Sequence, residues 1–315
     1  NGSTATEVAI KMAFQYFHNQ GVDKKKIIAI DGAYHGDTFG AMSVGDRGPF
    51  TAPFDPYLFE VEFIDFPDAD KEDEVWKNFK GLVESGDVAS FIFEPIVQGA
   101  SGMKFYSAEL LDRMIALAQG HDVICIADEV MTGFGRLGTL FAADLLEHKP
   151  DIICLSKGLT GGVLPMGVTS CTEKIQEAYR SNDLMKTFFH GHSFTGNPMI
   201  CAAANASLDL LLTDDCTNNR ERINQRHLAF LKQIESHSMV RNARVIGTIL
   251  AFDINTEKDT SYFNEARHHL YPYFIEKGLL IRPLGNVIYL IPPYIISDDD
   301  LDYVYTTILE FLNSY

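Results

Sequence analysis

Two stretches decide the fold of this chain, VICIADE at residues 123–129 and IICLSKGLTGG at residues 152–162. Each opens with a short apolar run and then becomes polar, the first at Asp128 and the second at Ser156 and Lys157. Apolar runs of this length are typical of strands that are buried on both faces of a parallel sheet. Because ligands bind beyond the carboxyl ends of such strands, we expect Asp128 and Lys157 to lie at a functional site.

Similar elements alternate along the rest of the first 213 residues. The pattern predicts strands at 27–30 and 91–93, and helices over 4–19, over 108–119 with Ser107 as N-cap, and from Pro198 to about 212. This alternation indicates a large α/β domain over residues 1–213, with a mostly parallel sheet flanked by helices. The chain opens at Asn1 inside a helical pattern, so we expect that an N-terminal segment is missing from this domain.

A smaller C-terminal α/β domain is predicted over residues 214–315. Its pattern indicates a helix to about residue 238, a strand at 248–254, a helix at 261–277, strands at 279–282 and 287–291, and a last helix capped by Ser297. Three aspartates, residues 298–300, occupy the first turn of that helix, where the helix dipole favours negative charge.

The composition restricts the class of protein. The 315 residues carry a net charge of −17, which argues against nucleic acid or an anionic membrane surface as a partner. Five cysteines are scattered without a C-x-x-C pair, as expected for a reduced, cytoplasmic protein. No apolar stretch approaches the roughly 20 residues that a membrane-spanning helix needs. His190 and His192 have no carboxylate or cysteine cluster beside them in sequence, so we expect no metal site.

The side chains of Lys157 and Asp128 are the ones whose chemistry indicates a function. A lysine at the end of a buried strand, followed by glycines, suits a Schiff base to an aldehyde cofactor, although a solvated lysine in a turn is the alternative. A buried carboxylate can keep a pyridine nitrogen protonated, although Asp128 could instead cap a turn or pair with Arg136. The two residues are 157 − 128 = 29 positions apart, about one βαβ unit, so their strands could be neighbours.

The run from Asp128 to Arg136, followed by the SKGLTGG run at residues 156–162, resembles class III aminotransferases, which are fold type I pyridoxal-phosphate enzymes. The resemblance covers essentially the whole chain. It implies a pyridoxal 5'-phosphate cofactor and a homodimer with sites at the interface. By resemblance the catalytic residues are Lys157, which carries the cofactor, Asp128, which pairs with the pyridinium, and Tyr34, which stacks on the ring.

The same resemblance assigns further binding residues. Val130 lies behind the ring, Gly2, Ser3 and Thr4 form the phosphate-binding turn, and Thr195 reaches the phosphate in the partner subunit. The turn also agrees with physical expectation, since the N-terminus of a helix favours a dianion. Arg282 binds the substrate carboxylate, which a guanidinium can hold bidentately.

Narrower features resemble the family members of biotin biosynthesis. These features are EPIVQGA at 94–100, YHGDT at 34–38 and IRPLGNVIY at 281–289. They imply amination of 7-keto-8-aminopelargonate to 7,8-diaminopelargonate, with S-adenosylmethionine as amino donor. Two alternatives stay open: another class III enzyme acting on ω-amino acids, diamines or ornithine, and a truncated, non-catalytic dimerising domain.

Overall fold

A computed structural model describes residues 1–256 and 260–314 of the chain. Residues 257–259 and 315, which fall within the predicted C-terminal domain, lie outside the described residues. The chain divides into two compact units. The first comprises Asn1–Gly99, Phe105–Phe134 and Phe141–Asp209, and the second comprises Ala100–Lys104, Gly135–Leu140 and Leu210–Tyr315. Two short segments from within the first 213 residues thus group with the C-terminal part of the chain.

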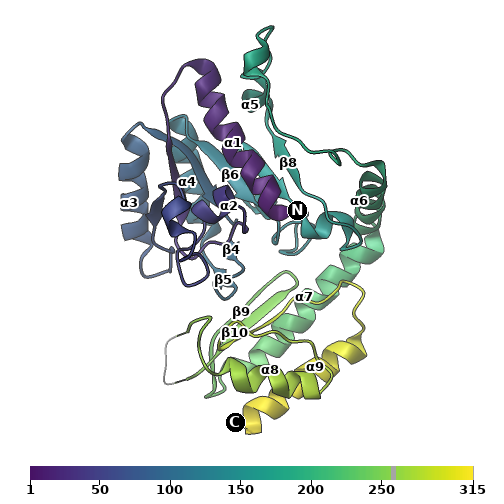
Figure 1. Cartoon of the computed structure of the whole chain (residues 1–315). Helices are drawn as coiled ribbons and strands as arrows, with labels where there is room; N and C mark the ends of the chain where they lie inside the picture. The colour runs from purple at the N-terminus through teal and green to yellow at the C-terminus, as the bar shows by residue number, and fades with distance from the viewer. Residues whose placement is uncertain (257–259, 315) are drawn as a thin grey trace. The chain divides into compact units, whose positions relative to one another are not determined.

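A sheet forms the centre of the first unit (Figure 1). In the described residues it has six strands, in the spatial order β2 (Glu62–Ile64), β1 (Lys26–Ile30), β3 (Val88–Phe93), β6 (Ile124–Asp128), β7 (Ile152–Leu155) and β8 (Val168–Cys171). Neighbouring strands are parallel except β7 and β8, which are antiparallel. This confirms the predicted mostly parallel sheet.

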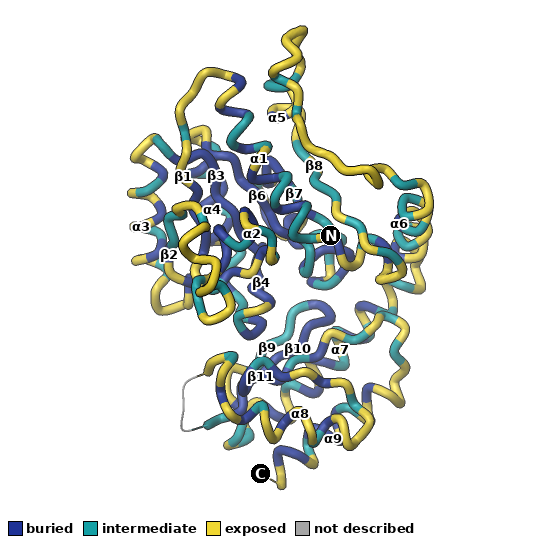
Figure 2. The backbone as a smooth tube through the Cα atoms, viewed as in Figure 1, coloured by how far each residue is buried: buried dark blue, intermediate teal, exposed yellow. Residues whose placement is uncertain are grey.

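Helices cover both faces of this sheet. α1 (Gly2–Gln20) covers one face, where its alanines and Phe17 contact Ile92 and Ile126 in one buried cluster. On the other face, Phe79 of α3 (Glu72–Glu84) packs against Phe91, the residue before Ile92, at 4.8 Å between ring centroids. Successive strand residues point to opposite faces of the sheet. Because helices cover both faces, the apolar side chains on both sides of these strands are buried (Figure 2).

Further elements of the chain connect these layers. α4 (Ala108–Gly120) begins at the predicted cap, where the Ser107 side chain accepts the Leu110 N–H. The remaining elements are α2 (Phe39–Ser43), η1 (Asp55–Tyr57), β4 (Val97–Gln98), β5 (Lys104–Phe105), η2 (Ala142–Leu145), η3 (Lys157–Thr160), α5 (Glu173–Glu177), η4 (Leu184–Lys186) and α6 (Pro198–Leu211). Among the helices that the structure describes, none combines the length and apolarity needed to cross a membrane.

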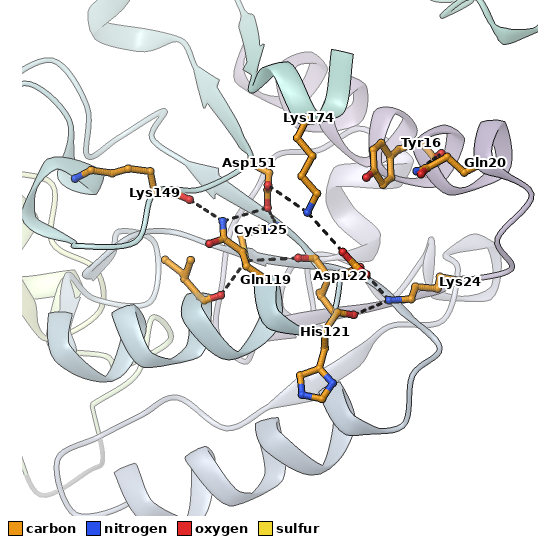
Figure 3. A network of polar contacts seen from close by, with 12 residues as sticks. Tyr16, Gln20, Lys24, Gln119, His121, Asp122, Cys125, Lys149, Asp151 and Lys174 are labelled. Atoms are coloured by element: carbon orange, nitrogen blue, oxygen red, sulfur yellow. Dashed lines mark hydrogen bonds and ion pairs between the residues drawn. The ribbon is translucent and has the colours of Figure 1, made fainter. Parts of the chain in front are cut away.

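A polar network lies near the amino ends of β6 and β7 (Figure 3). Asp151, immediately before β7, is buried and accepts the Cys125 N–H at 2.9 Å. The Lys174 amine lies 3.9 Å from Asp151 and 4.0 Å from Asp122. Since strands β6 and β7 are parallel, this network lies at the edge of the sheet opposite to Asp128 and Lys157.

The second unit contains a smaller antiparallel sheet. Its described strands have the order β11 (Val287–Leu290), β10 (Ile249–Ile254) and β9 (Val240–Ile246). An apolar cluster joins this sheet to α7 (Asp214–Ile234), α8 (Arg267–Glu276) and α9 (Asp298–Ser314). Ser297 caps α9 as predicted, since its hydroxyl oxygen accepts the Asp300 N–H at 3.1 Å.

Three expectations for the second unit were wrong. The helix predicted to reach residue 238 ends at Ile234, and the chain then forms β9, which was not predicted because Arg241 and Asn242 interrupt its apolar pattern. Residues 279–282 form no strand; the Ile281 N–H is taken locally by the Leu279 carbonyl, and Pro283 lacks a donor. The helix predicted over 261–277 begins only at Arg267, because a turn held by the Asn264 side chain precedes it.

Candidate active site

Strand pairing brings Asp128 and Lys157 to the same edge of the sheet. Asp128 is the last residue of β6 and pairs in register with Cys154 of β7, and Lys157 follows Cys154 by three residues. Asp128 is only 4% exposed, whereas Lys157 is solvent-exposed. Across residues 1–256 and 260–314, the Lys157 amine makes no hydrogen bond or ion pair. An accessible amine therefore lies close in the fold to a buried carboxylate.

The backbone of Lys157 is strained. Its φ is +34°, a left-handed value that side-chain-bearing residues rarely adopt. Ser156 holds the chain in place immediately before Lys157, because the Ser156 hydroxyl donates to the Met166 carbonyl at 2.5 Å. Such strain persists only where the surrounding structure imposes it, and it concentrates at functional sites.

Asp128 is held by two donors. One carboxylate oxygen lies 2.8 Å from Nδ1 of His35, and the other accepts the Val130 N–H at 3.0 Å. His35 is itself buried, and its Nε2 atom has no hydrogen-bond partner in the described part of the chain. These bonds fix the orientation of the Asp128 carboxylate and its position beside the loop after β1.

That loop presents Tyr34 next to His35. The Tyr34 ring is 47% exposed, and its hydroxyl donates to Asp37 at 3.1 Å. Partial burial raises the pKa of Tyr34, and the charges of Asp37 and Asp128 raise it further. Tyr34 thus adjoins His35, the residue that contacts Asp128.

The N-terminus of α1 meets the same loop. The Ser3 hydroxyl oxygen accepts the Asp37 N–H at 2.7 Å, and a Cβ on Gly36 would lie 1.9 Å from that oxygen. A Cβ on Gly2 would lie 2.9 Å from Cγ1 of Val130, so glycine is required for this close approach. Thr4 differs from its neighbours, because Asn1 accepts both its N–H and its hydroxyl, at 3.0 and 3.1 Å.

Thr195 and Arg282 are both exposed. Thr195 is exposed, and its hydroxyl oxygen accepts the His192 N–H at 3.0 Å. No described contact joins it to Asp128 or Lys157. Arg282 belongs to the second unit, where it is exposed, and its charge opposes the rise in pKa that burial causes at Tyr289.

Two buried glutamates were missed by the sequence reasoning. Glu94, which follows β3, accepts the N–H groups of Tyr34 and Gly99. Glu129, which follows Asp128, accepts the N–H groups of Ala142 and Ala143 and the Thr132 hydroxyl. For Glu94 the available signal was a carboxylate directly after the apolar run at 91–93, the same kind of signal that identified Asp128.

Comparison with known proteins decides the family. The model of the family described as aminotransferase class-III matches residues 1–312. The chain belongs to the class III aminotransferases. The predicted family, fold class, enzyme type and pyridoxal 5'-phosphate cofactor are thereby confirmed.

Individual relatives of this aminotransferase are similar over nearly its full length. An adenosylmethionine-8-amino-7-oxononanoate aminotransferase from Synechococcus elongatus is 44% identical, spanning 99% of this chain and 75% of the relative. A protein of the same name from Helicobacter pylori is 34% identical, spanning 99% and 73%. The solved structure of the Methanocaldococcus jannaschii enzyme of that name has a TM-score of 0.91 at 33% identity, covering 100% of this chain and 74% of that one.

A second solved structure bears on the cofactor. An amine transaminase from an uncultivated Pseudomonas species, in its pyridoxal-phosphate-bound form, has a TM-score of 0.92 at 27% identity and covers 100% of this chain and 75% of that chain. The residues of this aminotransferase fit such a group. Asp128 offers a carboxylate for the ring nitrogen, Lys157 offers an amine without a partner in the described chain, and Gly2 lets the start of α1 lie directly against Val130. Among the described residues, no three His, Cys, Asp or Glu side chains lie together as metal ligands.

Proposed function

We propose that this aminotransferase converts 7-keto-8-aminopelargonate to 7,8-diaminopelargonate in biotin biosynthesis, with S-adenosylmethionine as amino donor. The name adenosylmethionine-8-amino-7-oxononanoate aminotransferase, which relatives up to 44% identical carry, is the observation that supports this substrate pair. In that name 8-amino-7-oxononanoate is the keto substrate under its systematic name.

Each residue of the site has a proposed part in this reaction. When bound, pyridoxal phosphate would supply an electron sink for the reacting carbon. Lys157 would hold the cofactor covalently and, when its amine is free, would carry the proton between carbon atoms. Asp128 keeps a proton on the ring nitrogen, and its fixed bonds to His35 and Val130 orient it for that task.

The remaining cofactor contacts follow from position. Tyr34 and Val130 would contact the two faces of the ring, since Tyr34 adjoins His35, the partner of Asp128, and Val130 follows Asp128 by two residues. The N–H groups of Gly2 and Ser3 at the start of α1 would bind the phosphate, with Thr4 in the same turn. Because Asn1 already occupies the Thr4 N–H, we expect Gly2 and Ser3 to contribute most.

Arg282 is proposed to bind the carboxylate of the keto acid. Its guanidinium makes no hydrogen bond or ion pair within residues 1–256 and 260–314, so its donors are available for a bidentate contact. Residues 1–213 would form the large cofactor-binding domain and residues 214–315 the small domain that carries Arg282.

A second copy of the chain is the proposed partner. The segment around Thr195 exposes large apolar side chains, among them Leu184 (79% exposed), Met185 (74%) and Phe194 (71%). Figure 2 shows this segment, from η4 to α6, as predominantly exposed. An apolar surface of this kind is typical of a subunit interface, and dimerisation would bring Thr195 towards the partner's phosphate. Sedimentation of the double variant with Leu184→Asp and Met185→Asp should show monomers, with Val22→Asp as an exposed control.

We also propose a cytoplasmic location. All five cysteines are unpaired, as in proteins of reducing compartments.

The substrate proposal is tested by steady-state assays. Amination of the keto acid should be measurable with the purified chain, Lys157→Ala should abolish it, and Arg282→Ala should raise KM for the keto acid at least tenfold. Arg241→Ala is the matched control, because Arg241 is an exposed arginine of β9 in the same unit. Full activity of Lys157→Ala, or equal effects of the two arginine substitutions, would refute these assignments.

A second candidate function is amination of other carbonyl substrates. The Pseudomonas amine transaminase and an omega-transaminase from Thermomicrobium roseum both share the fold, at 27% identity and TM-scores of 0.92 and 0.91. A panel of ω-amino acids, diamines and ornithine separates the candidates. A higher kcat/KM with one of these donors than with S-adenosylmethionine would favour the second function.

A further inference from the structure

Glu94 joins two loops at the carboxyl edge of the central sheet, the edge at which Asp128 and Lys157 lie. It follows β3, and its side chain is only 5% exposed. One carboxylate oxygen accepts the N–H of Tyr34 at 3.1 Å, and the other accepts the N–H of Gly99 at 3.0 Å. A single side chain therefore ties the loop after β1 to the loop after β4.

The backbone around Glu94 is shaped for this contact. The Tyr106 hydroxyl donates to the Glu94 carbonyl at 2.6 Å. Ile96, two residues later, has a φ of +67°, which is a true outlier for a β-branched residue. The strained turn returns the chain so that the Gly99 N–H reaches the carboxylate of Glu94, five residues earlier.

The buried charge of Glu94 is energetically unfavourable, which points to a role for this carboxylate. Burying an ionised carboxyl is unfavourable unless it is well paired, and the described residues place no lysine or arginine on Glu94. Burial raises the pKa of Glu94 to about 6; the charge of His35 lowers it and that of Asp128 raises it. Glu94 thus lies within electrostatic reach of both members of the His35–Asp128 pair.

A second contact links the same regions. Gln98, in β4, donates from its amide to the Asp31 carbonyl at 3.1 Å. The segment after β3 consequently holds the loop after β1 at two points, on either side of Ala33. The second point is the main chain of Tyr34, the residue proposed to stack on the cofactor ring.

We propose that Glu94 is a positioning residue for the cofactor site. Its carboxylate fixes the main chain of Tyr34 and thereby sets the Tyr34 ring and the neighbouring His35, the partner of Asp128, before the cofactor binds. The effect on the cofactor rests on the proposed roles of Tyr34 and Asp128. The effect on the loop does not.

The test compares two buried carboxylates that each accept a backbone N–H. In Glu94→Gln, the amide keeps one acceptor oxygen but turns an NH2 group towards a backbone N–H, so one of the two bonds is lost. Asp151→Asn is the matched control, since Asp151 accepts the Cys125 N–H at the opposite edge of the sheet (Figure 3). Glu94→Asp keeps the charge but is one methylene shorter, so it provides a second variant if Glu94→Gln does not fold.

Two readouts are measured, and neither is enzyme activity. Hydrogen exchange of the amides in residues 31–37, measured without cofactor, should accelerate at least tenfold in the Glu94 variants and less than twofold in Asp151→Asn. The Kd for added pyridoxal phosphate, followed by absorbance, should rise at least tenfold in the Glu94 variants only.

Unchanged exchange in both Glu94 variants would overturn the proposal. An equal acceleration in Asp151→Asn would also overturn it, since the effect would then be a general loss of stability. Accelerated exchange with an unchanged Kd would confine Glu94 to the loop and overturn its role in cofactor binding. If the unsubstituted chain binds no pyridoxal phosphate, the proposed function fails, whereas the exchange measurement still decides whether Glu94 holds the loop.

Discussion

The buried carboxyl of Glu94 should make stability depend on pH in an unusual direction. Most paired carboxylates have lowered pKa values and stabilise the fold as pH rises. At Glu94, burial raises the pKa from 4.5 to about 6, so the folded state binds this proton more tightly than the unfolded chain does. The difference of 6 − 4.5 = 1.5 pKa units corresponds to about 2 kcal/mol at 1.36 kcal/mol per unit.

The sign of the effect follows from this shift. Above pH 6, Glu94 is ionised in both states and the full penalty of burying the charge is present. As pH falls from about 6 to below 4.5, the folded state takes up the proton first, so this group adds about 2 kcal/mol of stability. Glu94→Gln removes the titration. The free energy of unfolding of the unsubstituted protein, relative to that of Glu94→Gln, should therefore rise by about 2 kcal/mol between pH 8 and pH 4.

Urea denaturation at several pH values measures this difference. The single tryptophan, Trp76, lies in α3 of the unit that contains Glu94, so its fluorescence reports on the relevant unit. Both proteins are compared without cofactor, because ligand binding adds its own pH dependence. A difference that stays constant across this range, or that falls as pH falls, would refute the reasoning about Glu94.

Three further substitutions test the site. Asp128→Asn should lower kcat at least about 100-fold, because the site loses a preorganised charge, and a stopped-flow or steady-state assay with unchanged folding by circular dichroism would show it. Gly36→Ala should raise the Kd for pyridoxal phosphate and lower the free energy of unfolding by more than about 1 kcal/mol, since φ is +125° and the new Cβ would lie 1.9 Å from the Ser3 hydroxyl oxygen. Glu129→Gln should lower the free energy of unfolding by about 1–3 kcal/mol in urea, because the buried carboxylate accepts from three donors on its two oxygens and the NH2 group of an amide cannot accept; a loss below about 0.5 kcal/mol would contradict this.

Strands β1, β3, β6 and β7 of the central sheet could be predicted because each contains a short apolar run, most of it buried. Strands β2 and β8, which lack such a run and lie at the ends of the described strand order, were not predicted. The end of each run then locates the carboxyl edge, which is why Asp128 and Lys157 could be identified together. The same reasoning failed for β9, whose exposed Arg241 and Asn242 resemble the end of the preceding helix.

The contacts of Glu94 could not be read from the sequence, for a physical reason. Both of its partners are backbone N–H groups, which every residue except proline has, so no residue type marks them. The contact depends on the φ of Ile96 and on the path of the loop after β1, and both are results of the tertiary fold. The sequence showed only that a carboxylate follows an apolar strand.

Three buried carboxylates lie at the carboxyl ends of two neighbouring strands and make this edge of the sheet negatively charged when they are ionised. Glu94 follows β3, Asp128 is the last residue of β6 and Glu129 follows it, and β3 and β6 are adjacent in the sheet. The carboxylate oxygens of Glu94 and Glu129 accept backbone N–H groups and a hydroxyl, which satisfies their hydrogen bonding. Within residues 1–256 and 260–314, Asp128 is the one of the three that is bonded to a group able to carry positive charge, the His35 imidazole. If pyridoxal phosphate binds at Asp128 as proposed, the negative charge of Glu94, which interacts with that of Asp128, would help to keep the ring nitrogen protonated.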